Sequence, residues 1–503
     1  MQHVHTAARV CFAIATAAIS VVCAAATVTF PSTGSDIASA EDWGGTLPGT
    51  SDIVKFTTNA TVTASSDVEF GGLVMGRQNR TIVLDMRDSV SGGSPRRIKM
   101  NGSSYIEENI SNAKYVLRGG LWDFGVNSVC TGLSGDYTWN NGTSAQIDGG
   151  AVVLCDTLAG RYGVATTTNS LSVIGEGTVV TAKTVKVAQL NGKNNRFEFN
   201  DGAKVVLAGA GNSMSVGNGD TSSSSNWNWL RIIGGASLEQ SEIGGTLTVG
   251  QAGKDNLLSV EDGGLVSLKG TLSLAYDNDG NANSSSGNRI SVSGAGSRFV
   301  TQGEIRLGRG YGSSANSNNV VSVSDGAVFT NAAFRLRGHD NGIVISNATM
   351  STTSGGIECI EANAGTATNC FVRLQGTSPR LVLAGTSPNC DFKGSFRFEY
   401  DIPDDGYATV PVTLSAWARI AENTEFVVNG VKELQKAMRK RGIKNASYAL
   451  FKANGNLNTG MPTAAMLERW NARLPEGASL SYASRTLTLS VEAVEHGLML
   501  FVF

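Results

Sequence analysis

Apolar and polar residues alternate with a period of two in short stretches that recur through the middle of the chain. Each stretch begins with an asparagine, and the residues two and four positions later are apolar, as in "NRISV" from Asn288. Because successive side chains of a strand point to opposite faces, this alternation predicts a strand with one buried face. A glycine shortly afterwards, such as Gly294, predicts a turn at the end of that strand.

The pattern recurs at asparagines that are 22 to 33 residues apart, and a second alternating apolar pair follows 15 to 19 residues after most of them. Each repeat therefore supplies at least two short strands. One such unit cannot bury its own apolar face, whereas stacked units form parallel sheets around a continuous core, so the pattern predicts a β-solenoid. We expect the equivalent asparagines to stack as an inward ladder that satisfies backbone groups at a corner. They are Asn169, Asn195, Asn228, Asn256, Asn288, Asn319 and Asn341.

An antiparallel sandwich or a propeller is the competing all-β architecture, because both also consist of short strands and turns. The repeats vary in length within polar segments such as "DNDGNANSSSGN", and they carry no blade-type Trp-Asp signature. These features favour the solenoid. The composition agrees with β-structure rich in turns, since glycine is abundant at 61 residues, proline is scarce at 9, and only 16% of residues are charged.

The charge balance and the N-terminus restrict the classes of partner. Lys and Arg number 40 against 42 for Asp and Glu, which gives no net attraction to nucleic acid. Residues 1–26 combine Arg9, an apolar run and small residues at Ala24 and Ala26, a pattern typical of a cleaved signal peptide. We expect a secreted or cell-surface protein that is not an integral membrane protein, because the apolar run is too short to span a bilayer.

The repeat pattern stops near Gly394, so the expected organisation is a solenoid with its N-terminal cap over 27–393 and a capping or attachment region over 394–503. In the latter, Val431, Leu434 and Met438 share one face of a predicted helix, and "TAAMLERWNARL" predicts a second helix before a return to strands. A small α+β cap would cover strand edges that otherwise promote aggregation.

The N-x-[LIVF]-x-[VIF] repeat followed by Gly-Ala or Gly-Gly resembles the autotransporter-passenger-like and pectin-lyase-like β-helices of bacterial secreted and surface proteins. The resemblance covers roughly residues 165–350 and extends more weakly to 40–75. It implies a right-handed parallel β-helix. It does not imply a function, since adhesins, surface-layer components and polysaccharide enzymes share this architecture.

Few residues offer catalytic chemistry. Beyond the signal segment the histidines are His339 and His496, too few for a histidine-based zinc site or a Ser-His-Asp triad. The Gly-His pair at His339 resembles the polygalacturonase group, but the Asn-x-Asp, Asp-Asp and Arg-x-Lys motifs of that group are not in register with it. The adjacent aspartates Asp404 and Asp405 lie beyond the repeats in a predicted turn. We therefore expect no catalytic residues.

Two further candidates remain open at this stage. Asp277, Asp279 and Asn281 resemble part of a calcium loop, but the spacing is incomplete, and a flexible insertion is the simpler interpretation. Cys130 and Cys155 are separated by about one repeat, so stacking could bring them to disulfide distance. An equal alternative is that all five cysteines after the signal segment are small buried hydrophobic residues without disulfides. We expect no metal and no cofactor.

The outward-facing positions offer a candidate binding surface. If Leu230 and Ile232 point inward, alternation turns Trp227, Trp229 and Arg231 outward on one strand. Aromatic rings suit sugar faces, and guanidinium groups suit carboxylates. The alternative is that the tryptophans pack under a serine-rich loop and the arginines are ordinary solvated charges. A second outward set precedes inward leucines on successive coils and consists of Arg306, Arg335 and Arg337.

The leading hypothesis is a secreted or cell-surface bacterial β-solenoid with a structural, adhesive or glycan-contacting role and no catalysis. Its expected partner is an extracellular polysaccharide or a cell-envelope component. The alternative is an extracellular polysaccharide lyase or glycoside hydrolase of the β-helix type. A carboxylate-arginine pair from neighbouring coils would separate the two, and the sequence alone does not reveal one.

Overall fold

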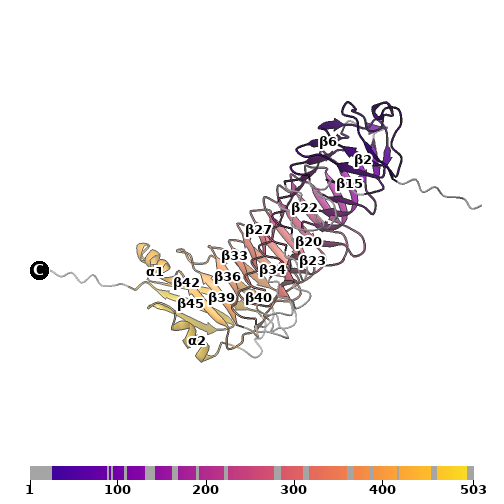
Figure 1. The fold of residues 1–503 in the computed structure, drawn as a ribbon. Helices are drawn as coiled ribbons and strands as arrows, with labels where there is room; N and C mark the ends of the chain where they lie inside the picture. Colours follow the sequence, from indigo (N-terminus) through magenta and orange to yellow (C-terminus); the bar gives the residue numbers. More distant parts are fainter. Residues whose placement is uncertain are drawn as a thin grey trace, which may run out of the picture.

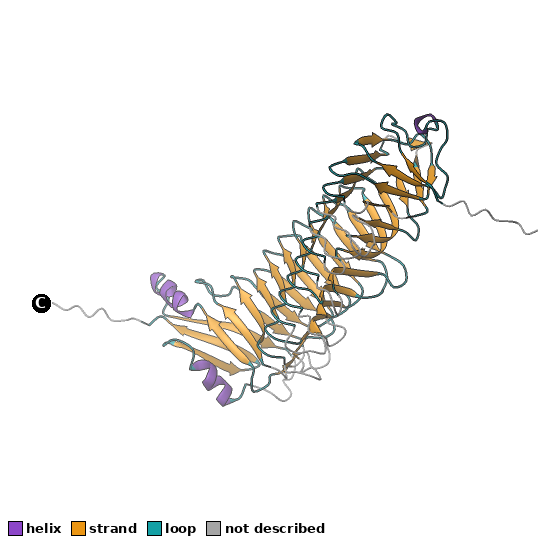
Figure 2. Ribbon diagram, in the orientation of Figure 1, coloured by secondary structure: helices purple, strands orange, loops and turns teal. Residues whose placement is uncertain are grey.

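The computed structural model describes residues 25–87, 90–91, 94–102, 104–106, 110–130, 142–160, 168–188, 192–219, 225–276, 285–309, 316–359, 367–384, 390–392, 395–415, 418–454 and 462–494. The chain forms an elongated rod in which coils follow one another from the N-terminal end to the C-terminal end (Figure 1). Strands dominate throughout, and two helices lie at the C-terminal end (Figure 2). The predicted all-β parallel solenoid is therefore confirmed.

Each central coil contributes three strands, one to each of three parallel stacks that we call face 1, face 2 and face 3 in the order in which the chain passes through them after a ladder asparagine. The sequence pattern predicted at least two. Face 1 is a separate sheet of 14 strands. Its strands are β3 (Ala60–Val62), β6 (Thr81–Asp85), β11 (Lys114–Arg118), β14 (Ser144–Asp148), β16 (Ser170–Ile174), β18 (Arg196–Asn200), β21 (Trp229–Ile232), β24 (Leu257–Val260), β27 (Arg289–Ser293), β30 (Val320–Ser324), β33 (Gly342–Ser346), β36 (Cys370–Gln375), β39 (Phe396–Asp401) and β42 (Glu425–Asn429).

Faces 2 and 3 are joined through two long strands, β15 (Val152–Ala159) and β17 (Val179–Lys186), which turn from one face to the other. The remaining strands of face 2 are β4 (Val68–Phe70), β9 (Arg97–Met100), β12 (Leu121–Asp123), β19 (Lys204–Leu207), β22 (Ser237–Gln240), β25 (Leu265–Leu268), β28 (Arg298–Thr301), β31 (Val328–Asn331), β34 (Thr349–Thr352), β37 (Arg380–Leu383) and β40 (Val412–Leu414). Those of face 3 are β1 (Thr27–Thr29), β2 (Ile53–Phe56), β5 (Gly72–Met75), β10 (Ser104–Ile106), β13 (Ser128–Cys130), β20 (Ser213–Asn218), β23 (Leu247–Gln251), β26 (Leu272–Tyr276), β29 (Ile305–Arg309), β32 (Phe334–Leu336), β35 (Ile357–Cys359), β38 (Cys390–Phe392) and β41 (Ala418–Arg419).

Register places like residues above one another in the core. On face 1, Leu230 pairs with Leu258, which pairs with Ile290, and all three are fully buried. On face 2, Phe299 and Phe329 stack with ring centroids 4.5 Å apart and nearly parallel planes. Each coil thus buries its apolar residues against the coils on either side, as the repeat logic requires.

The ladder asparagines are buried and hydrogen-bonded from coil to coil between Asn195 and Asn341. In each step, the backbone N–H and the side-chain Nδ2 of one asparagine donate to the Oδ1 of the next, as Asn256 does to Asn288 at 3.0 Å in both bonds. The second hydrogen of Nδ2 binds a turn carbonyl; Asn288 donates to the carbonyl of Gly253 at 2.9 Å. At the N-terminal end, Asn169 accepts from Thr143 instead.

The ladder imposes two backbone constraints on each coil. The residue before the asparagine adopts a left-handed conformation, with φ of 55° at Asp255 and 57° at Asn318. Where face 3 ends, the central coils also have positive φ at Gly217, Gly250 and Gly308. A Cβ on Gly250 would lie 2.2 Å from the side chain of Asn288, so glycine leaves the space that the ladder amide occupies.

Further short elements lie at the two ends of the rod. Near the N-terminus, the short 3-10 helix η1 (Glu41–Trp43) carries Trp43, whose ring packs edge-on against Phe30 at 4.7 Å. A small antiparallel hairpin, β7 (Val90–Ser91) with β8 (Ser94–Pro95), follows β6 in the chain and precedes β9. At the C-terminal end, face 2 continues from β40 into an antiparallel sheet of β43 (Asn445–Ala453), β45 (Thr486–Glu492) and β44 (Ala478–Ala483).

The two helices that the sequence predicts are present as α1 (Val431–Lys440) and α2 (Ala464–Asn471), and the three apolar residues of α1 are buried as expected. Asn471 donates to the carbonyl of Leu480 and accepts from its N–H at 3.0 and 2.6 Å. These bonds occupy backbone groups of β44 on the side away from β45, which makes that edge a poorer template for another strand. No helix in the described part of the chain is long and apolar enough to cross a membrane.

Two sequence-based expectations differ from the register. Parallel stacking does not stop near Gly394 but continues through β39 to β42 on face 1 and from β40 to β43 on face 2. On face 1, the alternating aromatic residues of β39 maintain the inward side after the asparagines end. Cys130 pairs with Ala159, four residues from Cys155 along β15, so coil stacking does not bring these two cysteines together. The sequence spacing matched one repeat, but the two cysteines occupy different positions within their coils.

Gly250→Ala tests the close approach between face 3 and the ladder. We expect the added methyl group to lower the free energy of unfolding by about 2–4 kcal/mol, because it overlaps Asn288 and occupies a left-handed conformation. Ala275, with φ of 63°, holds the equivalent position one coil later. Ala275→Gly is the matched control, and we expect a change of less than about 1 kcal/mol, since relief of strain offsets the lost methyl. Denaturant unfolding of both variants measures the difference; equal losses would contradict the assignment.

Candidate functional site

An aromatic and basic surface lies where the chain enters face 1 in the central coils; we call it the basic corner. Trp229 points outward at the start of β21 and pairs in register with Arg196 on β18 and with Leu257 on β24. The Arg196 guanidinium lies 4.6 Å from the Trp229 ring centroid, within the range of a cation–π contact. Exposed Arg289 follows Leu257 in the same column, so a basic residue flanks this aromatic-aliphatic strip at each end.

Trp227 is the most unusual residue of this surface. Its side chain is 46% exposed and its φ is 55°. The equivalent residue on the other asparagine-ladder coils is Asn, Asp, Gly or Thr. A bulky residue in the left-handed region is a genuine outlier that costs about 1–2 kcal/mol. The chain therefore retains an exposed indole at a position where a smaller residue would be more stable.

Two lysines lie on the coils before and after Trp227. Lys193 forms an isolated bridge with Asn226, and the backbone N–H of Trp227 donates to the carbonyl of Lys254 at 3.0 Å. Both lysine side chains are exposed. The corner thus combines a projecting indole with several positive charges.

Arg231 faces outward as expected but is engaged by carboxylates on both neighbouring strands. Its guanidinium lies 3.3 Å from Glu198 and 3.0 Å from Glu261. These two ion pairs compensate its charge, so Arg231 is less suited to anion binding than Arg196 or Arg289.

The second set of arginines forms an ion-paired cluster on face 3. Arg306 and Arg335 are direct neighbours in register, as the sequence suggested. Glu304 lies between them, 2.9 Å from Arg306 and 2.8 Å from Arg335, and Glu358 lies 3.8 Å from Arg335. Arg337 is half-buried, and its backbone N–H donates to Leu307. The structure therefore contains the carboxylate-arginine arrangement from neighbouring coils that the sequence did not reveal.

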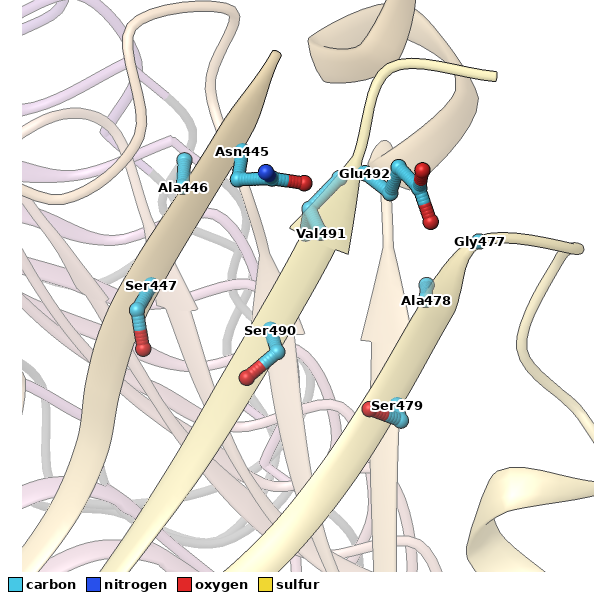
Figure 3. Close-up of a pocket in the computed structure, with 9 residues that line it drawn as sticks. All are labelled: Asn445, Ala446, Ser447, Gly477, Ala478, Ser479, Ser490, Val491 and Glu492. Carbon is cyan, nitrogen blue, oxygen red and sulfur yellow. The ribbon is translucent and has the colours of Figure 1, made fainter.

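Hollows are also found elsewhere on the described surface, and two of them have polar linings. One, of about 360 Å³, is a groove on face 3 lined by hydroxyl and amide side chains, among them Ser215 and Thr248. The other, of about 570 Å³, lies over the C-terminal antiparallel sheet, where Ser447, Ser490 and Ser479 occupy three neighbouring strands and Glu492 lies at one end (Figure 3). Glu492 is the one acidic residue among the residues that line the second hollow, which provides no acid-base pair.

The described residues offer little support for proton transfer or metal chemistry. The backbone of His339 forms isolated parallel β-bridges with Ser317 and with Thr368 on the neighbouring coils. No group of three or more His, Cys, Asp or Glu residues in the described ranges could hold a metal ion. The calcium-loop candidate Asp277, Asp279 and Asn281 and the residue His496 lie outside those ranges.

The pKa shifts of Asp148 and Tyr400 move both values further from pH 7. Burial opposes ionisation of Asp148, but hydrogen bonds from Arg118 and Gln146 hold the pKa of this carboxyl below its usual value. Burial raises the pKa of Tyr400 well above its usual value. A lowered carboxyl pKa makes a weaker base and a raised tyrosine pKa makes a weaker acid, so these shifts suit structural roles rather than acid-base catalysis near neutral pH.

Sequence reasoning located Trp227, Trp229 and the paired arginines but missed the groove on face 3 and the exceptional backbone of Trp227. A signal for the latter was present, because small or polar residues precede the other ladder asparagines. Comparison of the chain with protein-family models, curated proteins and solved structures finds no match. Function is therefore argued from these surfaces.

Glu304→Gln tests whether the face 3 cluster is structural. We expect the free energy of unfolding to fall by about 1 kcal/mol, because two neighbouring arginines lose the carboxylate between them. The loss should shrink at about 1 M salt, where exposed charges are screened. Denaturant unfolding at low and high salt measures both effects, with Glu242→Gln in an exposed turn as the control. Unchanged stability at low salt would show that the cluster does not support the fold.

Proposed function

We propose that this chain is a secreted or cell-surface bacterial β-solenoid that contacts an acidic extracellular polysaccharide, or a cell-envelope component of like chemistry, and does not cleave it. The signal-like pattern of residues 1–26 supports export. The elongated parallel fold supports a role as a scaffold that presents residues along one direction (Figure 1).

The single observation that carries the glycan-contacting role is the exposed Trp227 in a left-handed conformation. Strained residues that persist often do so because function selects them. An indole provides a flat apolar surface for a sugar ring, and the nearby Arg196, Lys193, Lys254 and Arg289 provide positive charge for carboxylates. The combination fits a polymer that has both sugar faces and acidic groups.

Trp227→Asn separates binding from folding. We expect this variant to be more stable than the native chain by about 1 kcal/mol, because asparagine tolerates the left-handed conformation. We also expect retention on immobilised polygalacturonate to fall at least about fivefold, since the stacking surface is lost. Thermal unfolding and affinity electrophoresis measure the two effects.

Asn318→Trp is the reciprocal control, because it places an indole at the equivalent position of another coil. It should lose stability by about 1–2 kcal/mol and gain no retention. A Trp227→Asn variant that binds polygalacturonate as well as the native chain would contradict the proposed contact.

A second candidate function is a polysaccharide lyase or hydrolase, favoured by the cluster of Glu304 and Glu358 with Arg306 and Arg335 on neighbouring coils. The test is a product screen of the chain from Thr27 onward against neutral and uronic-acid polysaccharides, with and without calcium. We expect retention without new reducing ends or unsaturated products. Products that disappear in Glu304→Gln would establish the enzyme instead.

A further inference from the structure

The outward side of face 2 is apolar over four successive strands, β12, β15, β17 and β19. Apolar side chains occupy most of the outward positions there, and Leu154 is 37% exposed in the middle of the sheet. Parallel strands that are apolar on both sides are typical of sheets that are covered on both faces. We call these apolar outward residues the face 2 patch; they are Leu121, Val152, Leu154, Val179 and Val206.

Ion pairs bound the face 2 patch at both of its ends. Arg97 on β9 pairs with Asp123 on β12 at one end, and Lys204 on β19 lies 2.8 Å from Glu239 on β22 at the other. The side chains of Arg97 and Lys204 are 51% and 44% exposed, so each has room for a second carboxylate. An apolar centre with a charged rim is the usual composition of a protein–protein interface.

The order of these charges is symmetric about a point between β15 and β17. The strands β9, β12, β15, β17, β19 and β22 are successive neighbours on face 2. Basic Arg97 and acidic Glu239 therefore lie on the strands third from this point, one on each side. Acidic Asp123 and basic Lys204 lie on the strands second from it.

This symmetry makes the face 2 patch complementary to a second copy of itself. A two-fold axis that runs along the strands through the central point turns two copies of face 2 toward each other and reverses the direction of one rod. The strand of Arg97 then faces the strand of Glu239 of the second copy, and the strand of Asp123 faces that of Lys204. Such self-complementarity is what a contact between two identical surfaces requires.

We propose that two copies of this chain associate through the face 2 patch with their long axes antiparallel. Association removes the apolar side chains from water and gives each charge at the rim a partner on the other copy. Two outward residues on each of six strands is about half the number in a standard interface, so the dimer is weak and forms with rising concentration. The contact does not include the basic corner, so it is independent of the polysaccharide contact proposed above.

Sedimentation equilibrium of the full chain from about 1 to about 200 µM tests the dimer. We expect a monomer–dimer equilibrium. Leu154→Lys should raise the Kd of the dimer at least about tenfold, because it places a charge among apolar side chains of the second copy. Ile443→Lys is the matched control, since Ile443 is 39% exposed and lies beyond α1 at the C-terminal end, and it should leave the Kd unchanged.

A charge exchange tests the antiparallel arrangement. Arg97→Glu should raise the Kd about fivefold at low salt, because it places two carboxylates on facing strands. The double variant Arg97→Glu/Glu239→Arg should return the Kd to within about twofold of the native value. Within one copy the two residues are five strands apart, about 24 Å, so they can compensate each other only between copies. Thermal unfolding confirms that each variant is folded.

Three results would overturn the proposal. A native chain that stays monomeric at about 200 µM would leave the face 2 patch to a different partner. Equal Kd values for Leu154→Lys and the native chain would place the contact elsewhere on the surface. A double variant that binds no better than Arg97→Glu would exclude the antiparallel arrangement.

Discussion

The asparagine ladder is the constraint on which the rest of the central rod depends. Each coil must turn into face 1 with its backbone polar groups buried, and an unsatisfied buried group is costly. The side chain of Asn288 meets this need in three ways, because it accepts from Asn256, donates to Asn319, and donates to a turn carbonyl. The same geometry is repeated on neighbouring coils, so the ladder fixes how one coil sits on the next.

This constraint also determines where the chain is free to vary. The ladder needs a left-handed residue before each asparagine and space at the end of face 3, but it places no demand on outward side chains or on the length of the segment between face 3 and the asparagine. Candidate binding groups therefore lie on outward positions, such as Trp229 and Arg289. Trp227 differs from both, because it occupies a position that the ladder does constrain and departs from the residue types that suit it.

Periodicity in the sequence predicted two of the three strands in each central coil, those of face 1 and face 3. The strand of face 2 was missed for a physical reason. Strands such as "KVVL" in β19 and "LVSL" in β25 carry apolar residues on the outward as well as the inward side. Alternation is then lost, and a strand only four residues long has no other strong signal. The partners of Arg231 were equally invisible, because the register that brings Glu198 and Glu261 to it from neighbouring coils depends on loop lengths rather than on local pattern.

The outer surface of a solenoid favours contact with an extended ligand over enclosure of a small one. Each coil packs only against its neighbours, so the described part of the rod presents open columns of side chains rather than a deep cleft. On face 3, the column that begins at Lys186 passes through hydroxyl residues to Arg306, while Glu304 is held between two arginines. A carboxylate held between two guanidinium groups on neighbouring coils stabilises the stack of coils. The ion-paired cluster therefore links neighbouring coils of face 3 through their outward side chains, and not only through the backbone ladder.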